Sequence, residues 1–91
     1  MLCGGYGSPK DADEEVQSIC DKMKSSVEQR LDKKLSETFQ AISYKTQVVA
    51  GTNYMIKVHI GGEEHINITV YKTLPHAGET LSLTDVEYHS T

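Results

Sequence analysis

The sequence predicts an α+β fold in which one long helix packs on an antiparallel β-sheet, and two spacing patterns indicate it. In the N-terminal third of the chain, apolar residues recur at steps of three and four, which places them on one face of a helix. After Phe39, apolar and polar residues alternate in several short runs, as they do in strands that bury one face. A lone helix with an apolar stripe can bury that stripe only on the sheet that follows it.

We predict that the helix runs from about Ala12 to about Leu35. Asp11, with Glu14 three residues later, resembles a capping box and places acidic groups at the positive end of the helix dipole. The residues expected on its buried face are Val16, Ile19, Cys20, Met23, Val27 and Leu31. Residues 1–10 contain three of the seven glycines and a proline, which predicts an irregular, flexible N-terminal trunk.

Four strands are expected after the helix, joined into an antiparallel meander. Gly61-Gly62 stands between two alternating runs and is a strong hairpin signal. The residues expected to face inward are Ile42 and Tyr44 in the first strand, Tyr54, Ile56, Val58 and Ile60 in the second, Ile66, Ile68 and Val70 in the third, and Leu81 and Leu83 in the fourth. The pattern leaves open whether the fourth strand continues through Val86 and Tyr88.

Length, composition and charge indicate one soluble domain. A chain of 91 residues with 37% apolar side chains suits one continuous core, so we assign residues 1–91 to a single domain. The net charge of -4 comes without the Lys/Arg stripe that phosphate binding needs, which argues against a nucleic-acid partner. The chain starts without an apolar run of signal-peptide length, and no window approaches a membrane span, so we expect a cytoplasmic protein with no membrane association.

The titratable side chains form no convincing catalytic or metal site. His59 and His65 flank the glycine turn and could approach each other, but zinc needs further closely spaced ligands, so we predict no metal site and no cofactor. Cys3 and Cys20 match neither a disulfide framework nor a zinc ligand set, and we expect two free thiols, with Cys20 in the core. Because the sequence offers no candidate acid, base and nucleophile together, we predict that the chain is not an enzyme.

An apolar turn, Gln47-Val48-Val49-Ala50-Gly51, stands out between the first two strands. A hairpin tip normally faces water and uses Asn, Asp, Gly or Ser, so apolar side chains there suggest a surface that a partner buries. The alternative is a hairpin in which Val48 and Val49 fold back on their own sheet. The pattern alone does not decide between the two.

Three motifs together resemble the stefin branch of the cystatin family. The QVVAG motif is complete at Gln47 to Gly51 and is followed by Thr52-Asn53-Tyr54, as in stefins. Gly4 lies where the family has a glycine in its inhibitory trunk, and Leu74-Pro75-His76 is similar to the second hairpin of stefins. The similarity extends over essentially the whole chain in order and spacing.

The resemblance implies a reversible, tight, noncovalent inhibitor of papain-like cysteine proteases, such as cathepsins B, H, L and S. Three elements would form a wedge that fills the apolar active-site cleft without offering a bond to cut. In the family, the trunk covers the non-primed side, the first hairpin crosses near the catalytic residues, and the second hairpin covers the primed side. The implied contact residues are Leu2, Cys3, Gly4 and Gly5 in the trunk, Gln47, Val48, Val49, Ala50 and Gly51 in the first hairpin, and Leu74, Pro75 and His76 in the second.

The alternative to an inhibitor is a non-inhibitory binding or self-assembling scaffold with the same fold, and an enzyme comes third. We expect a monomer, and a domain-swapped dimer is left open as a second state. The chain stops at Thr91, short of the C-terminal extension common among stefins. We therefore expect the last strand to be less covered, unless the sequence is cut short.

Overall fold

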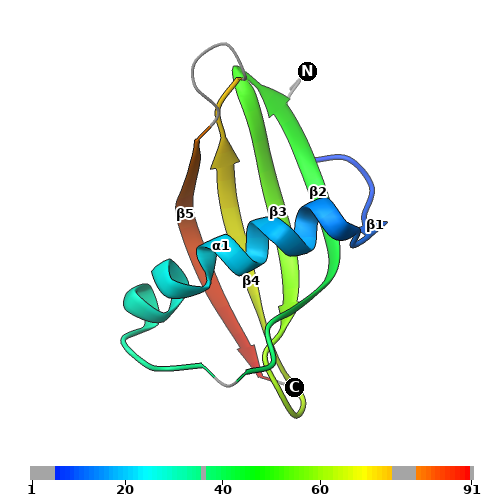
Figure 1. The fold of residues 1–91 in the computed structure, drawn as a ribbon. Coiled ribbons are helices and arrows are strands. Elements are labelled where there is room, and N and C mark those ends of the chain that lie inside the picture. The colour runs from blue at the N-terminus through cyan, green and yellow to red at the C-terminus, as the bar shows by residue number, and fades with distance from the viewer. Residues whose placement is uncertain (1–5, 36, 75–79, 91) are drawn as a thin grey trace.

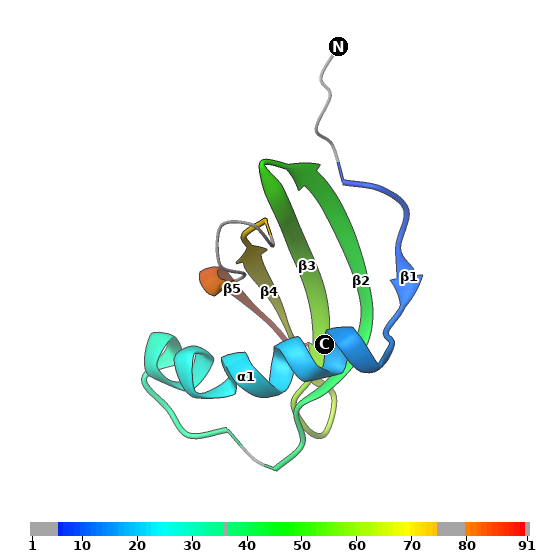
Figure 2. The ribbon, with the colours of Figure 1, turned by 45° about the horizontal axis from the view of Figure 1, so that its top comes forward.

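The fold is one helix packed on a five-stranded antiparallel sheet, as the sequence predicts (Figure 1). The computed structural model describes residues 6–35, 37–74 and 80–90. Strand order in the sheet follows chain order, and Figures 1 and 2 show the helix lying across one face of it. The elements are β1 (Lys10–Asp11), α1 (Glu14–Leu31), β2 (Gln40–Val49), β3 (Gly51–His59), β4 (Glu64–Lys72) and β5 (Leu81–Ser90).

The helix α1 is shorter than predicted at both ends, because two aspartates define its limits. Asp13 is the N-cap, and its carboxylate accepts a hydrogen bond from the Val16 N–H at 2.9 Å. Asp32 adopts the left-handed conformation with φ 56°, which ends the helix before the predicted limit at Leu35. The predicted start at Ala12 lies before the cap. Within the described residues, no helix is both long enough and apolar enough to span a membrane.

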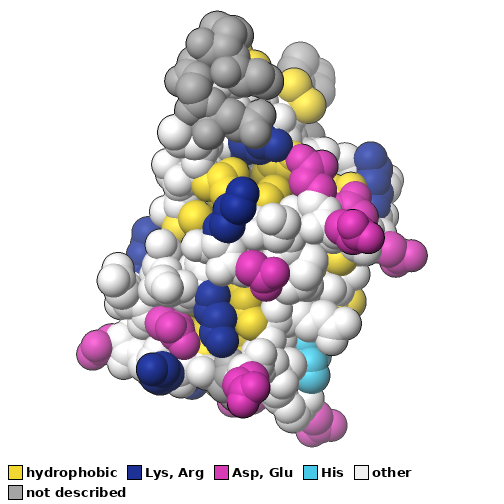
Figure 3. Space-filling model, viewed as in Figure 1, with side chains coloured by type: hydrophobic (Ala, Val, Ile, Leu, Met, Phe, Trp, Pro, Cys, Tyr) yellow, Lys and Arg dark blue, Asp and Glu magenta, His cyan; other side chains and the backbone are white. Residues whose placement is uncertain are grey.

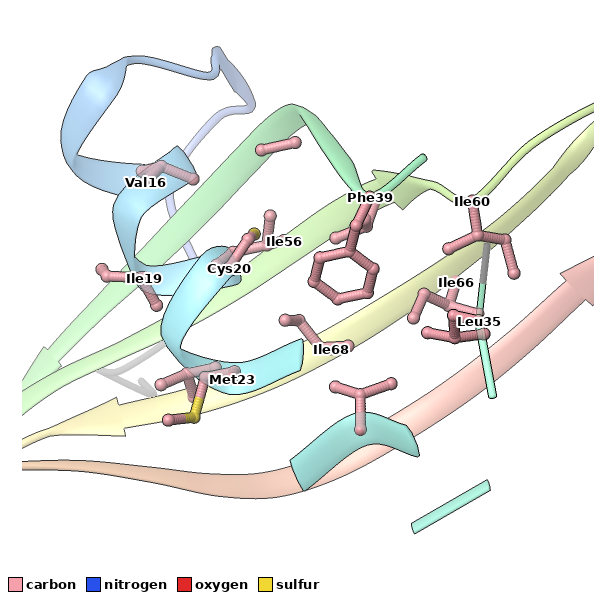
Figure 4. Close-up of a cluster of buried hydrophobic side chains, with 14 residues drawn as sticks. Val16, Ile19, Cys20, Met23, Leu35, Phe39, Ile56, Ile60, Ile66 and Ile68 are labelled. Atoms are coloured by element: carbon pink, nitrogen blue, oxygen red, sulfur yellow. The ribbon is translucent and has the colours of Figure 1, made fainter. Parts of the chain in front are cut away.

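The core lies between α1 and the central strands, where the predicted apolar faces meet (Figure 4). Burying each Val, Ile or Leu side chain contributes about 1.5–3 kcal/mol, so this layer is the main source of stability. Cys20 is a free, fully buried thiol, as predicted, and Cys3 lies outside the described residues. The buried residues are Val16, Ile19, Cys20, Met23, Val27, Leu35, Phe39, Ala41, Ile56, Val58, Ile60, Ile66, Ile68 and Val70.

A β-bulge in β2 overturns the prediction that Ile42 faces inward. Ala41 pairs with Val58 and Ser43 pairs with Lys57, so Ile42 is an extra residue on its strand. Ala41 is buried in its place, and Ile42 is 40% exposed. Tyr44, two residues later, packs against the core as predicted, although it is only partly buried.

A second β-bulge lies in β5 and interrupts the alternation that would delimit the last strand. Leu83 pairs with Val70 and Asp85 pairs with Thr69, which leaves Thr84 as the extra residue. The inward positions therefore shift by one along β5, from Leu81 and Leu83 to Val86. The strand does continue past Val86, to Ser90.

The segment before α1 is not irregular throughout. Lys10 and Asp11 form β1, which pairs with Tyr44 and Ser43 of β2. Further toward the N-terminus, the Gly7 N–H donates to the Thr46 carbonyl at 3.1 Å. The chain from Gly7 onward therefore follows β2, where the sequence predicted only an irregular trunk over residues 1–10.

Candidate functional site

The first hairpin exposes its apolar side chains, which decides between the two alternatives left by the sequence. Pairing between β2 and β3 extends to Val49 and Gly51, so Ala50 alone forms the reversal. Val48 is 77% exposed and Val49 is 45% exposed, and neither folds back into the core. Two adjacent exposed valines at the end of a long paired hairpin form an apolar surface that a partner can bury.

Gly51 is required by the shape of this hairpin. Its φ of 124° lies in a region that side chains rarely allow. A Cβ atom there would lie 2.6 Å from the Lys72 carbonyl oxygen and 2.6 Å from the Tyr71 hydroxyl oxygen. The glycine thus lets the hairpin pack closely against the end of β4.

Side-chain hydrogen bonds hold both ends of the QVVAG motif. Asn53 donates from Nδ2 to Gln47 Oε1 at 3.1 Å, across the pair that these two residues form in the β2–β3 ladder. The hydroxyl of Tyr71 donates to the Ala50 carbonyl at the reversal. The backbone of the tip is therefore fixed by polar contacts, while its valines are left free to contact another surface.

The loop between β4 and β5 leaves the sheet beside the first hairpin. Lys72 pairs with Thr52 on one side and with Leu81 on the other, so both connections lie at the same end of the sheet (Figure 1). The Thr73 N–H donates to the Thr80 carbonyl at 3.0 Å and closes this loop. Leu74 is 37% exposed at its start, and Pro75 and His76 lie outside the described residues.

The N-terminal segment is directed toward the same end. From Lys10, which pairs with Tyr44, the chain runs backward to Gly7, which bonds Thr46 and so lies nearer the tip of β2. The predicted trunk residues Leu2, Cys3, Gly4 and Gly5 lie outside the described residues. The structure thus places Gln47–Gly51 and Leu74 at the same end of the sheet, and it directs residues 7–10 toward that end.

The histidines that the sequence placed near each other do meet, at the opposite end of the sheet. The ring centroids of His59 and His65 lie 5.2 Å apart, and His59 Nε2 lies 2.8 Å from the Gly62 carbonyl oxygen. Among the described residues, no group of three or more His, Cys, Asp or Glu side chains has the arrangement of a metal site.

Figure 3 shows that the surface on the α1 side mixes Lys and Arg with Asp and Glu.

Tyr71 contacts the first hairpin, although the sequence alone assigns it no role there. The alternation of apolar and polar residues in the third predicted strand marks Tyr71 only as an outward-facing residue. The available signal was the Gly61-Gly62 turn, because counting back along both strands from a two-residue turn places Tyr71 opposite Thr52, close to the hairpin tip. The observed partner is the next residue, Asn53. The hydrogen bond from Tyr71 to Ala50 joins residues that the strand register does not pair, so the register alone does not predict it.

Comparison with known proteins agrees with this geometry. A model described as "Cystatin domain" matches residues 4–91. Cystatin-B of Paralichthys olivaceus is 55% identical over 83 residues, covering 91% of this chain and 84% of that protein. Leukocyte cysteine proteinase inhibitor 1 of Sus scrofa is 47% identical over 83 residues, covering 91% and 80%. Cystatin-B of Homo sapiens is 41% identical over 87 residues, covering 96% and 88%. A helix crossing an antiparallel sheet, an intact QVVAG hairpin and these similarities together place the chain in the cystatin family, in its stefin branch.

Proposed function

We propose that this chain is a reversible, tight, noncovalent inhibitor of papain-like cysteine proteases. The observation that carries the proposal is the exposed pair Val48 and Val49 on a braced hairpin, beside the loop that begins with Leu74. A relative is named a cysteine proteinase inhibitor, which favours inhibition over a scaffold without inhibitory activity. The chain would supply no catalysis of its own.

The first hairpin would act as an apolar plug. A papain-like active site is a cleft, and burying a fully exposed valine there contributes about 1.5–3 kcal/mol. Val48, which is 77% exposed, would contribute more than Val49, which is 45% exposed. The ladder between β2 and β3 continues to the tip, so the backbone of Val49 is held in the sheet and resists being drawn out as an extended substrate. Because the tip is already ordered before it binds, the entropy lost on association is reduced.

The other two elements would extend the contact along the cleft. We assign Leu2, Cys3, Gly4 and Gly5 to the non-primed side, and Leu74, Pro75 and His76 to the primed side. The course of residues 7–10 along β2 supports the first assignment, and the position of Leu74 beside the hairpin supports the second. The targets would be cathepsins of the B, H, L and S class, and the inhibitor would act as a monomer in the cytoplasm.

The test is a titration of active papain with the purified chain. The remaining papain activity is measured as the rate at which it hydrolyses a fluorogenic peptide. We expect activity to fall linearly to zero at one inhibitor per active site. Noncovalent, reversible binding predicts that papain recovers activity when the complex is diluted with excess substrate, and that the mass of the chain is unchanged. A folded chain that leaves papain fully active would overturn the proposal and favour the scaffold.

A further inference from the structure

Tyr71 contacts the first hairpin at the point where the chain reverses. Its hydroxyl donates a hydrogen bond to the Ala50 carbonyl, and its ring carbon Cζ lies 2.8 Å from the position that a Cβ on Gly51 would take. Ala50 is the residue that the β2–β3 ladder leaves unpaired. The tip is therefore held by a side chain from a strand outside the hairpin.

Tyr71 also belongs to the strand that leads into the second loop. Lys72 follows it and places its carbonyl oxygen against Gly51. Thr73 then closes the loop through its N–H bond to the Thr80 carbonyl and through the Thr80 N–H bond to its own Oγ1 at 2.7 Å. The end of β4 thus touches the first hairpin, and the next residue, Thr73, defines the start of the second.

We propose that Tyr71 is a positioning residue that sets the first hairpin tip in register with the loop at Leu74. The inference rests on the proposed function and adds a residue to it. An apolar cleft that contacts both elements must meet them at a constant separation, and the Tyr71 hydroxyl fixes that separation before the partner arrives. Without the hydroxyl, the Ala50 carbonyl bonds water and the tip samples other positions, so binding must order it.

A purely structural role would make a different prediction. If Tyr71 only filled space over Gly51, removing its hydroxyl would change neither inhibition nor the contribution of Val48. If Tyr71 positions the tip, removing its hydroxyl loosens the tip, and Val48 then contributes less to inhibition. The substitution Y71F deletes only the hydroxyl, and Y88F is the matched control, because the Tyr88 hydroxyl bonds Glu64 near the other end of the sheet.

The experiment measures the inhibition constant toward papain for the wild-type chain, Y71F, Y88F, V48A and the double variants Y71F/V48A and Y88F/V48A. We expect Y71F to weaken inhibition about fivefold, the equivalent of one net hydrogen bond, and Y88F to leave it unchanged. We also expect V48A to weaken inhibition less in the Y71F background than in the wild-type or Y88F background. Urea unfolding confirms that each variant is folded.

Three results would overturn the proposal: equal inhibition by Y71F and the wild type, equal loss in Y71F and Y88F, or additive effects of Y71F and V48A. A wild-type chain that does not inhibit would instead refute the proposed function. Amide hydrogen exchange at residues 49–51 then reports on Tyr71 by itself. Faster exchange in Y71F than in Y88F supports a role of Tyr71 in positioning the tip. Equal exchange in the two variants would refute that role.

Discussion

Gln17 accepts a hydrogen bond from the Ala41 N–H at 2.8 Å and so joins α1 to the start of β2. The same side chain donates from Nε2 to the Phe39 carbonyl at 3.0 Å. The amide of Gln17 therefore bonds the strand as a neighbouring backbone would, just before the bulge at Ile42. The side chains of Phe39 and Ala41 are buried, so the two backbone groups lie where water reaches them poorly.

We expect Gln17→Ala to lower the free energy of unfolding by about 1–3 kcal/mol, because it leaves a donor and an acceptor unpaired in a partly buried place. Urea unfolding of the purified variant measures this. Gln29→Ala is the control, since Gln29 lies on the same helix with an exposed side chain. Equal unfolding midpoints for the two variants would show that the Gln17 bridge adds no stability.

Replacing Val48 and Val49 with Asp should weaken inhibition of papain severely while leaving the fold nearly intact. Burying an unpaired charge in an apolar cleft costs on the order of several kcal/mol, whereas both side chains are exposed in the free protein. Inhibition constants and circular dichroism would be measured together. Ile42→Asp is the matched control, because it charges an exposed apolar residue of β2 far from the tip. Full inhibition by the folded double variant would remove the hairpin from the mechanism.

Deleting residues 1–5, or replacing Gly4 with Arg, should raise the dissociation rate of the complex more than it lowers the association rate. Changes at an interface act mainly on dissociation, and the short trunk would add contacts after the hairpins have engaged. Stopped-flow association and displacement assays give the two rates. Ser8→Arg adds the same charge at an exposed residue beyond the trunk contacts and serves as the control. Identical dissociation rates for the full-length and shortened chains would exclude the trunk from the contact.

A domain-swapped dimer that does not inhibit should form when the first hairpin opens. Val48 and Val49 are β-branched and already extended in β2, so opening the one-residue reversal at Ala50 would let β2 continue straight into β3. The helix and β2 would then pack on β3 to β5 of a second chain. Mild heating at high protein concentration should promote the exchange. Size-exclusion fractions of a C3S variant, run in reductant, would be assayed against papain, and a dimer that inhibits at full molar strength would contradict a hinge in this hairpin.

Stability should fall at alkaline pH because of Cys20. Burial, together with a smaller effect of the negative charge of Asp21, raises the pKa of the Cys20 thiol from 9.0 to about 12. The folded state therefore keeps a proton that the unfolded state releases, and the resulting stability is present below pH 9 and lost as pH rises toward 12. The slope in that window is about 1.4 kcal/mol per pH unit.

The measurement is urea unfolding of C3S and C3S/C20A at a series of pH values from about 8 to about 11. We expect a steeper loss for C3S than for C3S/C20A. Burial also raises the pKa of Tyr44, and a hydrogen bond to Glu64 raises that of Tyr88, but both tyrosines occur in both proteins and their effect cancels. Parallel pH curves would mean that Cys20 ionises as readily in the folded state as in the unfolded state.

The parts of the fold that the sequence predicted correctly are those with an uninterrupted period. The stripe of α1 and the alternation through Ile56 and Ile68 are continuous, so a simple count places their buried faces. The errors come from single inserted residues. A bulge at Ile42 or Thr84 shifts every later side chain by one position, and local composition does not mark where the shift occurs.

The candidate site was predictable where it depends on adjacent residues and not where it depends on contacts between strands. The apolar turn was visible in the sequence, but the exposure of Val48 and Val49 depends on how the hairpin is braced. The contact from Tyr71 joins residues 21 positions apart in the chain. The predictions for Leu2 to Gly5 and for Pro75 and His76 stay predictions, since these residues lie outside the described structure.

The exposed tip residues and the buried core share no member, since Val48, Val49 and Leu74 all lie outside the core. Substitutions at these three positions can therefore change which surface the chain prefers with little effect on whether it folds. Duplicated copies of such a gene could diverge in target choice by drift at a few codons, without first acquiring compensating mutations. The same separation makes these positions suitable for randomised libraries, in which Gly51 and Tyr71 would be kept constant to hold the loop in shape.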